Sequence, residues 1–270
     1  MHSIVMLLAI TPVFFTALFL MCFYRDRLRH HPMIHHLFIG VCAVFFYCWN
    51  YAAYELRWLE EGFMTLQNIS PFICTVILVA PFMHKRIRDF AYCAIAFLGF
   101  GMFLAMYISP CAEYFSSLRQ NTPFVYICEA ACHLLMALYG FYLILVERVE
   151  LSLRSFWRAV LFLYCAVGFG VFLNWCFHLS NFGMDMYGNY SIYFLDIFGS
   201  FTATFIAYLA GIFATVILGY LVGMFLSWIS TPTPRASSAS EPVISPSEAS
   251  MARVAARMGD TGEDPETLRP

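Results

Sequence analysis

Three side chains in the apolar part of the sequence have the types and spacing for acyl-transfer chemistry. Glu129 and His133 stand four residues apart in the apolar stretch 124–146, so on a helix they share one face. Cys74 lies about eleven residues into the stretch 63–83, and His133 about nine residues into its own. At about 1.5 Å per residue, these depths agree within a turn if both stretches are helices. A Cys nucleophile, a His general base and a Glu that orients the His suit a covalent mechanism.

Two other interpretations of these side chains stay open. Glu129 and His133 could bind a proton or a small polar ligand without catalysis, in a cavity that opens outward. They could also serve only to join helices, and a cysteine within an apolar helix more often packs than reacts. The sequence therefore leaves three functions: a lipid-modifying enzyme, a non-catalytic ligand-binding or transport protein, and a structural or assembly protein.

A second polar set is predicted near the outer ends of the same stretches. These side chains could converge above His133 and bind a polar headgroup, or they could cap helix ends and join the interfacial belt. They are Gln67, Asn68, Asn174, His178 and Asn181. A further cluster of histidines beside Arg29, which includes His35, is expected to be solvated or to contact lipid headgroups. No convincing metal spacing and no cofactor motif is present, so neither a metal nor a cofactor is predicted.

Membrane-spanning helices are the elements that must position these residues. The 270-residue chain is 61% hydrophobic and only 12% charged, with a mean hydropathy of +0.71. An ordinary soluble domain carries roughly 25% charged residues. The formal net charge of −2 gives no sign of nucleic-acid binding. The ten cysteines include no CxxC pair and do not indicate a disulfide framework.

Seven apolar stretches are long enough to cross a bilayer, which takes about 20 helical residues for about 30 Å of hydrocarbon. Helices are expected because strands with unpaired edges are too costly in lipid. The predicted fold is an all-α bundle of seven transmembrane helices in residues 1–230. The stretches are 4–24, 33–54, 63–83, 90–109, 124–146, 157–177 and 201–228.

Basic residues alternate between the two sides of this predicted bundle. The first, third and fifth loops hold nine, whereas the alternate loops hold only Arg57 and Arg119. By the positive-inside rule, the N-terminus is outside and the C-terminus is cytoplasmic. A disordered cytoplasmic tail is predicted for residues 231–270, and the cell membrane, as a bacterial inner membrane, is the expected location. The nine residues are Arg25, Arg27, Arg29, Lys85, Arg86, Arg88, Arg148, Arg154 and Arg158.

Gly219 and Gly223 form a small-xxx-small pattern in the last apolar stretch. This pattern indicates close helix packing, either within the bundle or between the subunits of a homo-oligomer. Membrane lipids are the other expected partners.

Short polar motifs recur in order through residues 4–228. They are Thr65-Leu-Gln-Asn68, His84–Tyr92, Tyr107–Pro110, Cys132-His133, Arg154–Ala159, Phe172–Trp175 and Asn181-Phe182. This pattern resembles the YwaF-type integral membrane protein family, whose animal relative is transmembrane protein 164. The resemblance implies a seven-helix bundle and, from the animal member, transfer of fatty acyl chains between phospholipids through a Cys and a His. The His corresponds to His133. The family thiol falls near Gln67 and Asn68, where this chain has none, and Cys74 lies two turns deeper.

Overall fold

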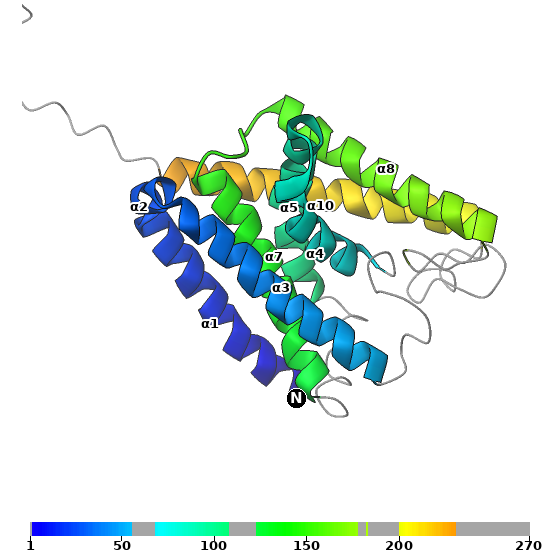
Figure 1. Cartoon of the computed structure of the whole chain (residues 1–270), viewed down its shortest axis with the longest axis horizontal. Helices are drawn as coiled ribbons and strands as arrows, with labels where there is room; N and C mark the ends of the chain where they lie inside the picture. The colour runs from blue at the N-terminus through cyan, green and yellow to red at the C-terminus, as the bar shows by residue number, and fades with distance from the viewer. Residues whose placement is uncertain (1, 56–67, 108–122, 178–181, 183–199, 231–270) are drawn as a thin grey trace, which may run out of the picture. The chain divides into compact units, whose positions relative to one another are not determined.

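The computed structural model describes residues 2–55, 68–107, 123–177, 182 and 200–230. These residues form helices and no strand (Figure 1). The predicted tail, 231–270, lies outside the described residues. The helices are α1 (His2–Phe23), α2 (Arg25–His30), α3 (Pro32–Glu55), α4 (Ile69–Val79), the 3-10 turn η2 (Ala80–Phe82), α5 (Lys85–Ala105), α7 (Pro123–Leu145), α8 (Leu153–Phe177) and α10 (Phe201–Ser230).

Five of these helices are long and apolar enough to cross a membrane: α3, α5, α7, α8 and α10. The apolar segments Ile10–Phe23 of α1 and Ile69–Phe82 of α4 and η2 are shorter. Large apolar side chains also face outward, and Met33 and Trp228 are 80% and 74% exposed. A soluble monomer rarely presents so much apolar surface, whereas lipid solvates it. The chain is therefore an all-helical, multi-pass membrane protein.

Six of the seven predicted stretches coincide with helices to within five residues at each end. The third differs, because the described helix begins at Ile69 and residues 63–67 of the predicted stretch lie outside the described part. From Ile69 to Phe82 the chain advances only about 21 Å at 1.5 Å per residue. This part of the stretch is therefore shorter than the hydrocarbon core.

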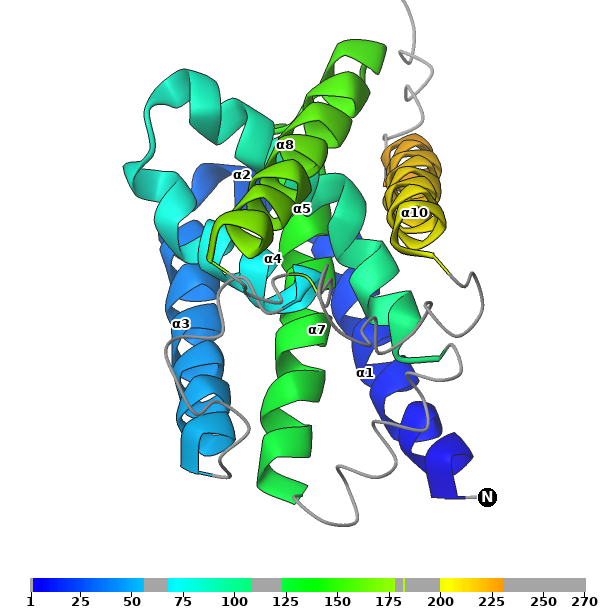
Figure 2. The same ribbon diagram turned by 90° about the vertical axis from the view of Figure 1, so that its right-hand side faces the viewer.

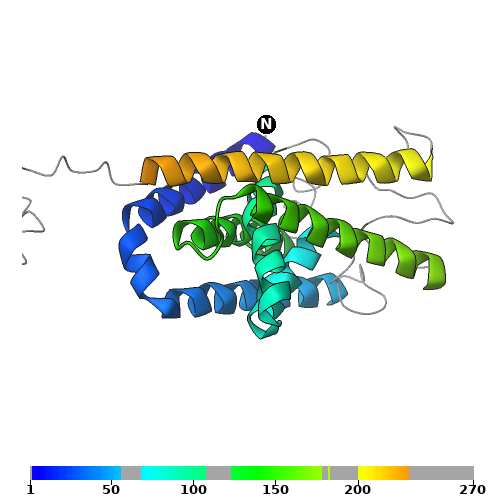
Figure 3. The same ribbon diagram turned by 90° about the horizontal axis from the view of Figure 1, so that it is seen from above.

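Helix α7 is the most buried of the long helices, and α5 packs along it. Figure 2 shows α7 between α1 and α3, and in Figure 3 α3 and α10 lie on opposite sides of it. Gly140 permits the close approach of α7 to α5, since a Cβ there would stand 2.8 Å from the carbonyl oxygen of Ile95. Most side chains of α7 therefore lie in the bundle interior.

The Gly219 and Gly223 face of α10 packs within the chain. A Cβ at Gly219 would collide with the backbone carbonyl oxygen of Phe97 on α5. One at Gly223 would stand 2.9 Å from Cδ1 of Ile144 on α7. Packing within the bundle was one of the two predicted roles of this pattern, and it is the one that the structure contains.

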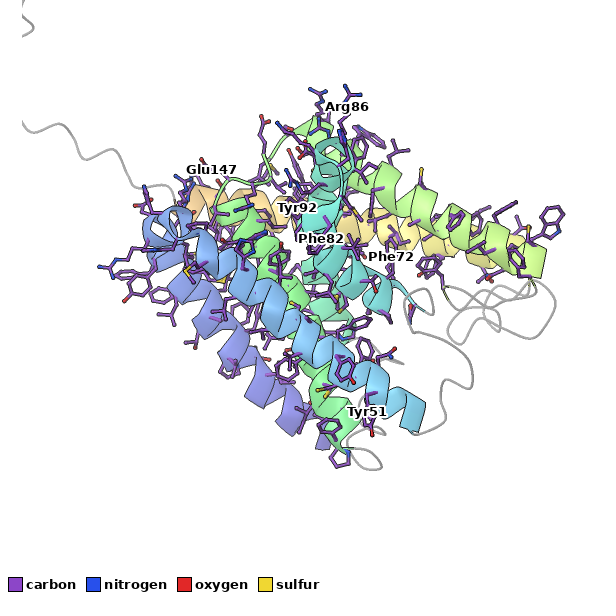
Figure 4. All side chains as sticks on the ribbon, viewed as in Figure 1. Tyr51, Phe72, Phe82, Arg86, Tyr92 and Glu147 are labelled. Carbon is purple, nitrogen blue, oxygen red and sulfur yellow. The ribbon has the colours of Figure 1, made fainter. Side chains whose placement is uncertain are left out.

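Arg25 joins three helix ends at one end of the bundle. Its Nε donates to the carbonyl oxygen of Leu145 at 3.1 Å, and its Nη1 donates to the carbonyl oxygen of Ser230 at 3.2 Å. Its Nη2 lies 3.0 Å from the carboxylate of Glu147, which Arg29 also contacts. Glu147 is labelled in Figure 4. A cation at the carbonyl ends of α7 and α10 is favourable for both helix dipoles.

Arg25→Ala is expected to lower the free energy of unfolding by about 1–3 kcal/mol, because two helix C-termini lose a charged donor. Thermal unfolding in detergent measures this change. Arg27→Ala is the control, because Arg27 lies on the same short helix, is exposed and stacks only on Tyr24, 5.5 Å from its ring centroid. The control should change stability by at most about 0.5 kcal/mol. Equal effects of the two substitutions would contradict the role given to Arg25.

Candidate functional site

His133 is the centre of a polar site in the bundle interior. It is the eleventh residue of the 23-residue helix α7, about 15 Å from its start, and is only 5% exposed. Its Nδ1 lies 2.8 Å from the backbone carbonyl oxygen of Glu129, one turn earlier. A carbonyl oxygen only accepts, so Nδ1 carries the hydrogen and Nε2 of the neutral ring is an acceptor.

Ser70 supplies the hydroxyl that faces this acceptor. Its Oγ lies 3.0 Å from Nε2 of His133, and both side chains are buried. With Nδ1 protonated, the serine hydroxyl donates to Nε2, which is the arrangement of a nucleophile beside its general base. The other neighbour of this hydroxyl is the thioether sulfur of Met102, a weak acceptor at 3.6 Å.

The position of Ser70 follows from where α4 begins. Asn68 caps this helix: its Oδ1 accepts from the backbone N–H of Ile69 at 2.7 Å, and its carbonyl oxygen accepts from the N–H of Phe72. Ser70 is thus in the first turn of α4, level with the middle of α7. The backbone N–H of Ser70 has no intrahelical acceptor, because Ser70 is in the first turn of the helix. The next residue, Pro71, has no backbone N–H.

The structure differs from the sequence-based pairing of Cys74 with His133. Because α4 begins level with the middle of α7, Ser70 and not Cys74 stands at the depth of the histidine. The thiol of Cys74 lies one turn further along α4 and is buried, 2% exposed. The backbone carbonyl of Glu129 also accepts from the imidazole, a contact that the predicted role of the Glu129 side chain did not include.

Trp49 on α3 also lies beside His133. Its ring centroid lies 6.2 Å from that of His133, and its side chain is 3% exposed. Within the described part of the chain, the indole N–H has no hydrogen-bond acceptor. A buried donor without an acceptor is costly, so this N–H is available to an oxygen atom of a bound molecule.

The second predicted polar set is only partly described. Asn68 is the helix cap of α4, as the alternative interpretation of these amides expected. Asn174 is fully buried near the end of α8. Gln67, His178 and Asn181 lie outside the described residues, so their convergence above His133 stays a prediction.

His35 lies in a second interior cluster that sequence analysis missed. It was expected to be solvated or to contact headgroups, yet it is 4% exposed, with Nε2 and Nδ1 each 3.3 Å from the hydroxyls of Tyr92 and Tyr139. Of these, Tyr92 is labelled in Figure 4. The signal for its burial was present, because His35 precedes Cys42 and Trp49 at intervals of seven residues. That spacing places all three on one helix face.

Among the described residues, no set of three or more histidine, cysteine or acidic side chains could hold a metal ion. The polar groups that the described site offers are the hydroxyl of Ser70, the imidazole of His133 and the indole N–H of Trp49. Comparison of the chain with protein-family models, curated proteins and solved structures finds no match.

Proposed function

We propose that the protein is a seven-span membrane acyltransferase in which Ser70 is the nucleophile and His133 the general base. The seven spans are the five long helices together with α1 and the segment that contains α4. The N-terminus lies outside the cell membrane, and the C-terminal tail lies in the cytoplasm. The resemblance to the YwaF-type family supports acyl transfer between lipids, with Ser70 two residues after Asn68 in place of the family thiol.

Contacts between the basic loops support this orientation. Arg25 of the first loop lies beside Glu147 and Leu145 at the end of α7 and beside Ser230 at the end of α10. The guanidinium of Arg158 lies 5.7 Å from the ring centroid of Phe90 near the start of α5. The basic residues predicted to be cytoplasmic thus come from segments that are neighbours in space, as one membrane face requires.

Reporter tags at the two termini test this orientation in cells. An N-terminal tag is expected to be accessible from outside, and a C-terminal tag only after the membrane is permeabilised. If both tags report the same compartment, the seven-span topology is wrong.

The proposed reaction begins when Ser70 Oγ attacks the ester carbonyl carbon of a phospholipid while His133 Nε2 takes the hydroxyl proton. The bond from the carbonyl carbon to the glycerol oxygen then breaks, and this proton passes to the leaving oxygen, which releases a lysolipid. The hydroxyl of an acceptor lipid attacks the acyl-serine, gives its proton to Nε2 and takes the acyl chain. The proton returns to Ser70 Oγ as the serine leaves.

Two donors near the nucleophile suit the oxyanion of this reaction. The N–H of Ser70 is left without an intrahelical acceptor by its place in the first turn of α4, and the indole N–H of Trp49 is buried beside His133. Donors aimed at developing negative charge are usually a large part of catalysis, and more so where water is excluded. The observation that carries the proposal remains the 3.0 Å contact between Ser70 Oγ and His133 Nε2.

Labelling with a phospholipid that carries a radioactive acyl chain tests the proposal. The purified protein is expected to retain label that resists neutral hydroxylamine and is released by alkaline hydroxylamine, as an oxygen ester is. Ser70→Ala should reduce the label to background. Ser70→Cys should retain it as a thioester, which neutral hydroxylamine cleaves.

Cys74→Ala is the matched control, because Cys74 is buried one turn from Ser70 on the same helix, and His133 contacts Ser70. It should keep the label of the unchanged protein. Labelling that persists in Ser70→Ala and disappears in Cys74→Ala would restore Cys74 as nucleophile, and absence of label would end the proposal.

A non-catalytic ligand or proton site is the second candidate, because the Glu129 side chain is buried one turn from His133. An ionisable side chain inside a membrane bundle commonly binds an ion, a proton or a polar ligand. This function needs the carboxyl group, whereas the proposed acyl transfer needs only the Glu129 carbonyl, so a single substitution separates them.

A further inference from the structure

His35 joins three helices inside the bundle, and the proposed acyl transfer does not use it. Its Nε2 lies 3.3 Å from the hydroxyl oxygen of Tyr92 on α5, and its Nδ1 lies 3.3 Å from that of Tyr139 on α7. Its ring also stacks on the rings of Tyr139 and Tyr142, with centroids 5.7 and 6.1 Å away. The imidazole is thus a polar junction of α3 with α5 and α7.

The hydrogen bonds of this junction suit a neutral imidazole. A neutral ring has one N–H donor and one acceptor nitrogen, and a tyrosine hydroxyl can donate or accept. One tyrosine therefore donates to the acceptor nitrogen, and the other accepts from the N–H. A protonated ring has two N–H donors and a positive charge, so the tyrosine that donated must turn its hydrogen away.

The charged groups around His35 add to the cost of a positive charge there. They are Arg88 on α5, Arg148 after the end of α7, and the neighbouring His36 on α3. Arg88 precedes Tyr92 by one turn, which places it on the face of α5 that meets His35. The stacked tyrosine rings attract a cation, but a buried charge among other cationic groups costs more than this attraction returns.

A proton has only a short distance to travel from water to His35. His35 is the fourth residue of α3, so it lies about one turn from the start of the helix. His31 and His36, on either side of it in the sequence, are both exposed. The buried imidazole is therefore close to the aqueous phase beside the basic loops.

We infer that His35 is a proton-binding switch: acidification of the adjoining aqueous phase charges its imidazole and loosens the packing of α3 against α5 and α7. Trp49, which lies beside His133, is on the same helix, so this loosening also reaches the candidate site. The switch does not depend on the proposed acyl transfer, because it concerns the packing of α3.

Thermal unfolding of the full-length protein in detergent tests the switch. Between about pH 7.5 and about pH 5.5, which bracket the usual titration of histidine, the unfolding temperature of the unchanged protein is expected to fall by about 5 °C. The fall is expected because the proton binds more readily to the unfolded chain than to the enclosed ring. His35→Gln should unfold at the same temperature at both pH values, since its amide keeps a donor and an acceptor but takes up no proton.

His36→Gln is the matched control, because His36 is the next residue on α3 and is exposed. This variant should show the same fall as the unchanged protein. An equal fall in His35→Gln, or no fall in the unchanged protein, would overturn the inference.

Alkylation of Cys42 tests the switch in the unchanged protein, even if His35→Gln does not fold. Cys42 is 3% exposed and follows His35 by seven residues, on the same face of α3. Acid slows the reaction of an ordinary thiol with N-ethylmaleimide, because the thiolate is the nucleophile. The rate at Cys42 relative to that at Cys165, which is exposed on α8, is nevertheless expected to rise several-fold on acidification. A constant or falling ratio would contradict the loosening of α3.

Discussion

His133→Ala is expected to lower the rate of acyl transfer by about 10²–10⁴-fold, whereas Glu129→Gln should leave the rate within a few-fold of the unchanged protein. His133 Nε2 is the only base in contact with Ser70 Oγ among the described residues. Its orientation comes from the backbone carbonyl of Glu129, which every side chain at position 129 preserves. Transfer of a labelled acyl chain from phospholipid to lysophospholipid measures both rates.

The comparison of these two variants also decides between the two candidate functions. Thermal unfolding is measured in parallel, because a buried carboxyl at position 129 also contributes to packing. If Glu129→Gln, while folded, loses as much activity as His133→Ala, the carboxyl group is required and the interpretation of the Ser70–His133 contact is wrong. If neither variant transfers acyl chains differently from the unchanged protein, the polar pair is structural.

Most of the helices could be predicted because hydrocarbon imposes one simple requirement. A stretch near 20 apolar residues long crosses lipid only as a helix, so its ends follow directly from where polar residues begin. Helix α7 begins at Pro123 and α10 at Phe201, each within one residue of its predicted start. Composition alone therefore determined these elements.

The site could not be predicted to the same detail because it depends on one helix cap. The apolar stretch 63–83 gives no sign that the described helix starts at Ile69, since Asn68 could equally have been a ligand-binding amide. This start sets which residue of α4 stands level with His133. A shift of one turn exchanges Cys74 for Ser70, and that exchange changes the proposed nucleophile from a thiol to a hydroxyl.

Which helices contact one another could not be predicted for a related reason. Small residues indicate that a second helix approaches closely, but they do not indicate which helix it is. The pattern at Gly219 suited a neighbouring subunit as well as a neighbouring helix. Only the arrangement of α5 against α10 shows that Phe97 occupies this face. Any side chain at position 219 should therefore lower the free energy of unfolding.

Gly219→Ala is accordingly expected to destabilise the protein by about 1–3 kcal/mol, because its Cβ would collide with the backbone carbonyl oxygen of Phe97, which no rotamer change can move. Gly211→Ala on the same helix is the control, since a Cβ there has nothing within 4 Å. The control should be neutral or stabilise by up to about 1 kcal/mol through helix propensity. Thermal unfolding in one detergent compares them. Equal stability of the two variants would show that α10 does not pack against Phe97, and α5 and α10 would need a different arrangement.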